Sequence, residues 1–200
     1  MEFQQVVDRR RMIRSYTDEP VDPAVVRRIL TNALHAPSAG FSQGWAFLLL
    51  DSPDDVGRFW SSTTPAGEGA DAWSGGMVRA PVIVVPMSCK REYIDRYAEG
   101  DKGWTDRDES HWPVPYWDID TGMAGLLILL TATDEGLGAC FFGIPPEMTE
   151  SFRAEFGVPA DYAPIGAVTI GHRAGAEPVT GSAATRSRRP LGEVVHRSSW

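Results

Sequence analysis

Ala-Pro-Ser-Ala-Gly-Phe-Ser-Gln-Gly-Trp, residues 36–45, is the stretch from which the rest of the chain can be placed. Apolar side chains recur at helical spacing over residues 23–35, which predicts an amphipathic helix before the stretch. The apolar run 45–50 predicts a short strand after it, which the turn residues 51–53 end. The glycines and serines of the connecting loop leave backbone N–H groups free and let a flat ligand approach the backbone closely. Taken alone, the loop is more simply an ordinary helix-to-strand turn.

The remaining apolar segments predict further strands and helices in alternation. Residues 81–87, 137–144 and 164–171 predict strands, and Pro86 indicates that the first of these is an edge strand or ends there. Residues 3–9, 54–60, 118–135 and 147–156 predict helices. The helix over 118–135 is apolar nearly all round, so we expect it to be central or buried between subunits. Residues 61–76 read as a loop of low definition. Without an internal repeat or a linker, residues 1–200 are predicted to form one α+β or α/β domain.

Composition narrows the class of protein. A chain of 200 residues with 42% hydrophobic content can bury one sizeable core. The N-terminus lacks the pattern of a signal peptide, and the longest apolar run, 123–130, is too short to cross a bilayer. Two cysteines, Cys89 and Cys140, fit a reducing compartment better than a disulfide framework. We therefore expect a cytoplasmic protein that has no membrane partner.

Basic residues are concentrated at the two ends of an acidic chain. The formal net charge of −8 argues against broad nucleic-acid binding. Seven of the 19 Lys and Arg nevertheless lie in the short segments 9–14 and 186–189. They are either two solvated charge runs or two halves of one anion site. A phosphate dianion would suit the second alternative, because each guanidinium fork makes charge-assisted bonds of fixed geometry.

Residues 90–117 carry half of all Trp and Tyr in the chain, interleaved with charged side chains and few aliphatics. Three interpretations stay open: a lid or substrate wall, part of a dimer interface, or a solvated insertion. A lid over a flat ligand is the first of these, and we expect it to use Tyr93, Trp104 and Trp112.

The chain shows no self-contained catalytic group, so we name no catalytic residue. Its four histidines are scattered without the spacing of metal ligands, which predicts no metal site. A Gly-x-Ser-x-Gly elbow is absent, and the glycines at 136, 138 and 143 lack the spacing of a dinucleotide fingerprint. A basic cluster, a Gly/Ser loop and an aromatic segment together suit a protein whose chemistry is carried by a bound, phosphorylated aromatic cofactor.

Four segments, in the same order, resemble motifs of the nitroreductase superfamily of FMN-dependent flavoproteins. Residues 10–16, Arg-Arg-Met-Ile-Arg-Ser-Tyr, resemble the entry motif that holds the FMN phosphate and ribityl chain. The stretch 36–45 resembles the motif that lines the isoalloxazine ring. Residues 135–144 resemble the strand whose end offers a backbone N–H to flavin N5, and residues 186–191 resemble the closing motif that returns cations to the phosphate. The similarity covers nearly the whole chain, apart from 61–78 and most of 90–117.

The resemblance implies an α+β nitroreductase-like fold, with a central, mostly antiparallel sheet flanked by helices, and an intertwined homodimer with FMN at the subunit interface. Residues 90–117 would then be the lid or insertion, and residues 172–200 an arm that packs on the partner subunit. The cofactor-binding residues that the matched motifs imply are Arg10, Arg11, Met12, Arg14, Pro37, Ser38, Ala39, Phe41, Gln43, Phe142, Gly143, Ile144, Arg186 and Arg188.

The activity that the resemblance implies is hydride transfer from NAD(P)H, through FMN, to a small planar acceptor such as a nitro, quinone-like or unsaturated compound. Met12, Phe41 and Gly44 stand where the family commonly has serine, asparagine and proline, and they bear on the native reaction more than on FMN binding. Three alternatives stay open: an FMN-dependent dehydrogenase or oxidase acting on a biosynthetic intermediate, a non-catalytic flavin-binding protein, and a phosphoanion- or RNA-binding module.

Overall fold

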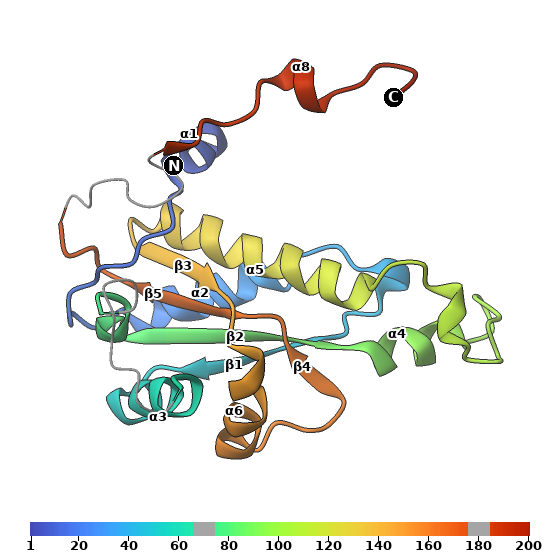
Figure 1. The fold of residues 1–200 in the computed structure, drawn as a ribbon, viewed down its shortest axis with the longest axis horizontal. Helices are drawn as coiled ribbons and strands as arrows, with labels where there is room; N and C mark the ends of the chain where they lie inside the picture. Colours follow the sequence, from blue (N-terminus) through green and yellow to red (C-terminus); the bar gives the residue numbers. More distant parts are fainter. Residues whose placement is uncertain (66–74, 176–184) are drawn as a thin grey trace.

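A central antiparallel sheet organises the computed structural model, which describes residues 1–65, 75–175 and 185–200 (Figure 1). Its strand order is β1 (Trp45–Leu50), β2 (Val82–Cys89), β5 (Ala167–Gly171) and β3 (Gly138–Phe142), so β1 and β3 lie at opposite edges. The short β4 (Tyr162–Pro164) pairs with the end of β2, beyond the point where β5 stops. The predicted α+β class with a mostly antiparallel sheet is confirmed.

Helices cover both faces of this sheet (Figure 1). On one face α2 and α5 pack against alternate strand residues such as Val82 and Val84. On the other face α3 and α6 pack against the residues between them, Ile83 and Val85. Because successive strand residues point to opposite faces, one buried strand serves two cores, which explains its almost wholly apolar sequence. The helix bounds are α1 (Phe3–Arg9), α2 (Pro23–Ala33), α3 (Pro53–Thr63), α4 (Lys90–Tyr97), α5 (Tyr116–Asp134), α6 (Thr149–Phe156) and α8 (Leu191–Val194), with short 3-10 turns at Ala39–Phe41, Met77–Arg79, Glu109–His111 and Pro146–Met148.

The prediction that Pro86 marks an edge strand or the end of a strand is wrong, because β2 lies between β1 and β5 and continues to Cys89. Pro86 pairs with Phe47 of β1 on one side. On the other side its carbonyl accepts a hydrogen bond from the N–H of Ile165, at the break where β5 has ended and β4 begins. Since the N and C=O of a strand residue point the same way, the missing N–H of the proline faces this break between β4 and β5, and at most one ladder bond is lost.

Local signals account for where the helices begin. The Asp22 side chain accepts a hydrogen bond from the N–H of Ala24, and Pro23 occupies the first turn of α2. Ser52 caps α3 in the same way, and that helix continues to Thr63, so it includes the first residues of the predicted loop 61–76. Residues 66–74 of that loop lie outside the described residues.

The helix α5 presents one face to the core and another to solvent. Its small and branched residues Ala124, Ile128 and Ala132 are fully buried. Its opposite face exposes the apolar side chains of Tyr116, Ile119, Met123 and Leu126. The side-chain spacing of three and four residues makes them a continuous stripe. Among the described residues, no helix combines the length and the apolar character needed to cross a membrane.

The last residues leave the body of the sheet. The described chain continues beyond β5 to residue 175 and resumes at residue 185, from where it runs past α1 and carries α8 away from the sheet (Figure 1). Residues 176–184 of the predicted arm 172–200 lie outside the described residues. The assignment of residues 1–200 to a single domain with a lid over 90–117 stays a prediction.

Candidate functional site

The loop between α2 and β1 holds an unusual backbone conformation. Gly40, Phe41 and Gln43 have φ angles of 61°, 55° and 51°, all in the left-handed region. This region is easy for glycine but costs other residues roughly 1–2 kcal/mol each. Hydrogen bonds within the loop close it: the N–H of Gln43 donates to Ser38 Oγ at 3.0 Å, and Ser42 Oγ donates to the Ala39 carbonyl at 2.7 Å. The result presents Phe41 to solvent with 72% of its surface exposed.

Both loop glycines are required by aromatic rings of α4 packed against the loop backbone. A Cβ on Gly40 would lie 2.5 Å from Cε2 of Tyr97. A Cβ on Gly44 would lie 2.5 Å from Cε2 of Tyr93 and 2.8 Å from the carbonyl oxygen of Cys89. The start of the aromatic segment 90–117 is therefore a platform under the loop.

The structure corrects the prediction that Tyr93 belongs to a mobile lid. Its side chain is fully buried beneath Gly44, and its hydroxyl donates to Asp120 Oδ2 at 2.9 Å. Burial, and then the neighbouring carboxylate of Asp120, raise the pKa of the Tyr93 hydroxyl well above its usual range. A side chain held in this way offers no surface to a substrate. The reason is positional, because α4 follows β2 directly and turns its first aromatic residue into the core.

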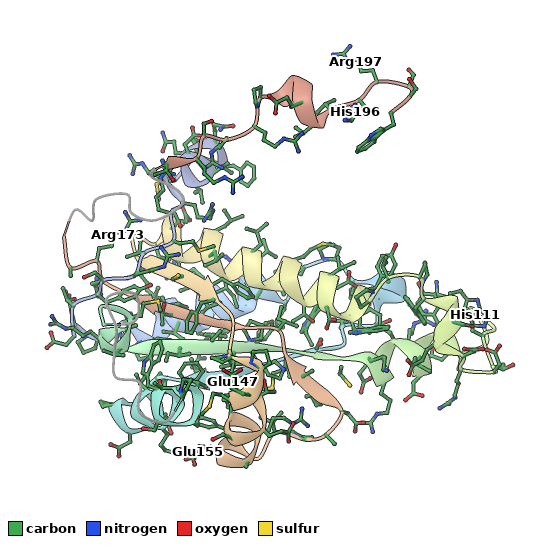
Figure 2. The ribbon with its side chains drawn as sticks, in the orientation of Figure 1. His111, Glu147, Glu155, Arg173, His196 and Arg197 are labelled. Atoms are coloured by element: carbon green, nitrogen blue, oxygen red, sulfur yellow. The ribbon has the colours of Figure 1, made fainter. Side chains whose placement is uncertain are left out.

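The other two predicted lid residues lie in an aromatic cluster, whose members are Tyr93, Tyr97, Trp104, Trp112 and Trp117. Trp112 is in contact with Tyr97 and Trp104 at ring-centroid distances of 4.5 and 5.4 Å. Both tryptophans are half-buried, and His111 lies next to Trp104 at the far end of the molecule (Figure 2). Most of the ring pairs in the cluster pack edge to face, an arrangement that stabilises the segment without any ligand. A lid role for Trp104 and Trp112 stays a prediction.

The two arginine runs meet at one cavity. Arg10 and Arg11 from the N-terminal segment and Arg188 from the C-terminal segment line a cavity of about 700 Å³, together with Phe3, Val7, Asp8, Leu126 and Leu130. The sequence interpretation of one shared site is thus supported in its geometry for these three residues, whereas the bound anion stays a prediction. Arg14 is half-buried and Arg186 exposed, and neither belongs to the lining of this cavity.

The edge strand β3 connects the arginine segment to the predicted flavin-facing backbone. Met12 forms a bridge with Ala139, and its Sδ accepts a hydrogen bond from the N–H of Phe141 at 3.4 Å. Phe142 ends β3, where its buried ring stacks on Trp60 at 5.6 Å. Gly143 follows it, is exposed, and would meet no atom within 4 Å if it carried a Cβ. With the half-buried Ile144 next to it, this backbone leaves open space for a flat ring.

One chain does not bring the loop and the arginine cavity to the same place. The loop precedes β1, at the sheet edge opposite β3, and three strand spacings separate these edges by about 14 Å. The loop is also bonded to Asp120, near the start of α5, whereas the arginine cavity is lined by Leu126 and Leu130 further along the same helix. They lie 126 − 120 = 6 and 130 − 120 = 10 residues beyond Asp120, which corresponds to about 9–15 Å of helix. Two groups of predicted site residues therefore lie apart in one chain, and we refer to them as the predicted half-sites: Pro37, Ser38, Ala39, Phe41 and Gln43 in one, and Arg10, Arg11 and Arg188 in the other.

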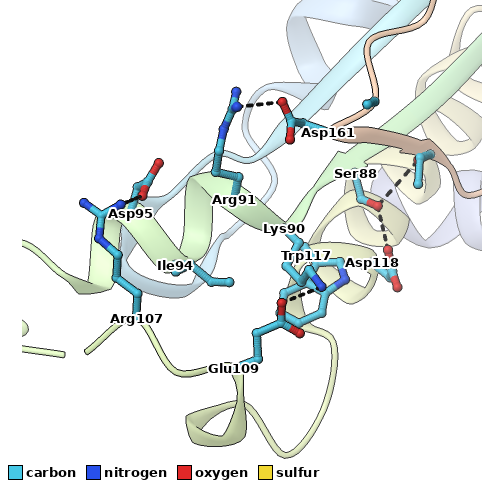
Figure 3. Close-up of a pocket in the computed structure, with 12 residues that line it drawn as sticks. Ser88, Lys90, Arg91, Ile94, Asp95, Arg107, Glu109, Trp117, Asp118 and Asp161 are labelled. Carbon is cyan, nitrogen blue, oxygen red and sulfur yellow. Dashed lines mark hydrogen bonds and ion pairs between the residues drawn. The ribbon is translucent and has the colours of Figure 1, made fainter. Parts of the chain in front are cut away.

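A second cavity, of about 620 Å³, lies between α4 and the β4 end of the sheet (Figure 3). Three ion pairs surround it: Lys90 with Glu109 at 2.7 Å, Arg91 with Asp161 at 2.6 Å, and Arg107 with Asp95 at 2.6 Å. Each cation already has a carboxylate partner, so this cavity lacks the excess positive charge of the arginine cavity.

The sequence interpretation missed the residues that support the loop from outside, chiefly Asp120 and Arg96. Asp120 is only 2% exposed, but Asp118 lies two residues before it on the same helix, so the sequence does not single out its carboxylate. Arg96 gave no signal, because nothing in the sequence distinguishes it from the other cations of the segment 90–117.

Comparisons with known proteins agree with this fold and its motifs. The model of the nitroreductase family matches residues 7–172, and the chain belongs to that family. A relative from Methanothermobacter thermautotrophicus, named "Putative NADH dehydrogenase/NAD(P)H nitroreductase", is 25% identical over 177 residues, which cover 87% of this chain and 78% of the relative.

Two solved structures show the same fold. A nitroreductase family protein from Clostridium difficile 630 aligns with a TM-score of 0.74 at 21% identity, covering all of both chains. A "putative nitroreductase in complex with fmn" from Desulfovibrio desulfuricans aligns with a TM-score of 0.71 at 23% identity, covering 100% of this chain and 98% of that one.

Proposed function

We propose that this protein is an FMN-dependent oxidoreductase that passes hydride from NAD(P)H, through bound FMN, to a small planar acceptor. The observation that carries the proposal is the arrangement along β3. A cavity lined by three arginines lies beside the segment that pairs with the start of this strand, and open backbone at Gly143 follows its end. FMN joins a phosphate group to a flat ring through a short chain, so its phosphate complements the arginines and its ring complements the open backbone. Family membership and the FMN held by the Desulfovibrio relative support the same cofactor.

The residues present fit FMN. Arg10, Arg11 and Arg188 would bind the phosphate dianion, with Arg14 and Arg186 adding positive charge nearby. Met12 and residues 142–144 would line one side of the ring system. The loop residues Pro37, Ser38, Ala39, Phe41 and Gln43 would line it from the second half-site.

A homodimer would complete the site, because the half-sites of one chain lie apart. The exposed apolar stripe of α5 continues onto α1, where Phe3 and Val7 are exposed as well. The segment 185–200 exposes Leu191 and Trp200 while it extends away from its own sheet. Apolar surface of this extent is typical of an interface, and a second copy of the chain supplies both a matching stripe and the missing half-site.

FMN, when bound, would supply the chemistry of hydride transfer between a reduced nicotinamide and an acceptor. The chain contributes binding and environment. Its arginines neutralise the phosphate, and backbone N–H groups at the end of β3 are available to the ring. Phe41 would exclude water from the ring, which strengthens electrostatic interactions there. Trp104 and Trp112 stay candidates for the wall that contacts the acceptor. We place the reaction in the cytoplasm, with no nucleic acid or membrane as partner.

The test is an absorbance spectrum of the purified protein loaded with FMN, repeated anaerobically after NADPH and then NADH. We expect a flavin band that bleaches with one or both donors and returns when a quinone or nitroarene is added. A protein that binds FMN but does not bleach would instead favour the dehydrogenase or storage alternatives. A protein that takes up no FMN would refute the proposed site.

A further inference from the structure

The flavin-facing loop is anchored by a buried carboxylate. The N–H of Ala39, in the centre of the loop, donates to Asp120 Oδ2 at 2.8 Å. The same oxygen accepts the hydroxyl hydrogen bond from Tyr93 at 2.9 Å. Asp120 is 2% exposed and belongs to the second turn of α5. Burial of a charged carboxylate costs free energy unless hydrogen bonds compensate it. Asp120 accepts two such bonds from neutral donors, and one of these donors is a backbone N–H of the loop.

A second anchor approaches the same loop from α4. Arg96 Nε donates to the carbonyl of Gly40 at 2.9 Å. Its two terminal nitrogens each bond to an oxygen of Asp101 at 2.7 Å, and Nη1 also lies 3.2 Å from Glu99. This bidentate pairing fixes the plane of the guanidinium, so the Nε–H has a defined direction.

The two anchors bond to consecutive residues, Ala39 and Gly40, directly before the left-handed Phe41. The strain of the left-handed non-glycine residues favours relaxation of an isolated loop. The hydrogen bonds within the loop can persist when the whole loop moves, whereas the bonds to Asp120 and Arg96 fix the loop relative to α5 and α4. Those helices also supply the rings beneath Gly40 and Gly44.

We propose that Asp120 and Arg96 are positioning residues, which hold the loop 38–43 in the conformation that presents Phe41 to the cofactor of the partner subunit. Both side chains act on the loop backbone, through the N–H of Ala39 and the carbonyl of Gly40. The proposal rests on the proposed function for its consequence, but the anchoring itself is a property of the protein without cofactor.

The experiment compares Asp120→Ala with Asp120→Asn, which keeps one acceptor oxygen for both donors. Asp118→Ala is the matched control, because Asp118 lies two residues away on α5 and its carboxylate accepts a hydrogen bond from Ser88 Oγ, outside the loop, at 2.6 Å. Hydrogen exchange of the Ala39 amide is measured on the protein without FMN, and the Kd for FMN by titration of flavin fluorescence. Arg96→Ala, a change at a partly exposed side chain, tests the same proposal without opening a buried gap.

We expect Asp120→Ala to exchange the Ala39 amide at least tenfold faster and to bind FMN at least tenfold more weakly, since each lost bond has a charged acceptor. Asp120→Asn should stay within about threefold of wild type in both, and Arg96→Ala should weaken FMN binding about threefold to tenfold. Unchanged exchange, or an unchanged Kd for FMN, in folded Asp120→Ala would overturn the proposal. So would an Asp118→Ala variant that matches it. If Asp120→Ala does not fold, an unchanged Kd in Arg96→Ala overturns it. A wild-type protein that binds no FMN would refute the proposed function, and with it the role of the loop towards the cofactor, even where the exchange difference persists.

Discussion

Replacing Gly44 by alanine tests most directly how the loop packs on the ring of Tyr93. The new Cβ would lie 2.5 Å from Cε2 of Tyr93 and 2.8 Å from the carbonyl oxygen of Cys89, both far inside van der Waals contact. The ring cannot swing away, because Tyr93 is fully buried and its hydroxyl is bonded to Asp120. The carbonyl oxygen of Cys89 cannot move far either, because Cys89 belongs to β2 and this strand is paired on both sides.

Overpacking of this kind destabilises a core by about 1–3 kcal/mol, and two rigid neighbours place Gly44→Ala in the upper half of that range. For a chain of this length we expect the Tm to fall by about 4–12 °C. Gly57→Ala is the matched control, because Gly57 lies within α3 and its Cβ would meet no atom within 4 Å. That change should raise stability by about 0.5–1 kcal/mol, since alanine favours a helix interior.

The assay is thermal unfolding followed by circular dichroism, at one protein concentration and without FMN, because bound ligand and subunit exchange both shift the Tm. A Tm for Gly44→Ala equal to that of wild type, next to a raised Tm for Gly57→Ala, would refute the packing of Tyr93 beneath the loop. A lower Tm in both variants would indicate that the loss of stability in Gly44→Ala does not come specifically from the contact with Tyr93.

Three further predictions concern the arginine cavity, the apolar stripe and the buried tyrosine. Arg188→Ala should weaken FMN binding at least tenfold and make it less dependent on salt, measured by titration at two ionic strengths, because one charge-assisted bond to the phosphate is lost. Leu126→Glu, on the exposed face of α5, should convert a dimer to monomer in light scattering, whereas an unaltered dimer would refute the assigned interface. Tyr93→Phe should reduce the loss of stability at alkaline pH. The pKa of Tyr93 is higher in the folded protein than in the unfolded one, so the stabilisation from its protonated hydroxyl is complete below about pH 10, where free tyrosine titrates. It is lost as the pH rises further. Urea unfolding of both proteins at pH 8 and pH 11 measures this loss of stability.

Elements defined by short-range signals could be predicted from the sequence. The strand Trp45–Leu50 has the predicted bounds, and α2 begins at Pro23 because an aspartate cap and a proline precede its apolar face. The central position of β2 could not be predicted. Pro86 normally excludes a central strand, and its tolerance depends on β4 replacing β5 as neighbour at that residue.

The candidate site likewise has features that the sequence indicated and features that depend on tertiary contacts. The charge pattern left open whether Arg10 and Arg188 are solvated or converge on one site, and the structure places both in the lining of one cavity. The role of Tyr93 was predicted wrongly, because an aromatic residue among charged ones reads as a surface feature until Gly44 is known to admit its ring. Asp120 escaped notice because its partners are a backbone N–H 81 residues away and a hydroxyl 27 residues away. Such pairings depend on tertiary structure and have no local signature.

The claim that two chains share each FMN site is tested most directly by subunit complementation. One chain carries Arg10→Ala with Arg11→Ala, the other carries Phe41→Asp, and each homodimer is first shown to bind no FMN. Two affinity tags isolate the mixed dimer. If the arginines of one chain and the loop of the other form a site, one of its two sites contains only wild-type residues, and the mixed dimer should bind one FMN per dimer. A mixed dimer that binds none would show that each chain builds its own site, which contradicts the account.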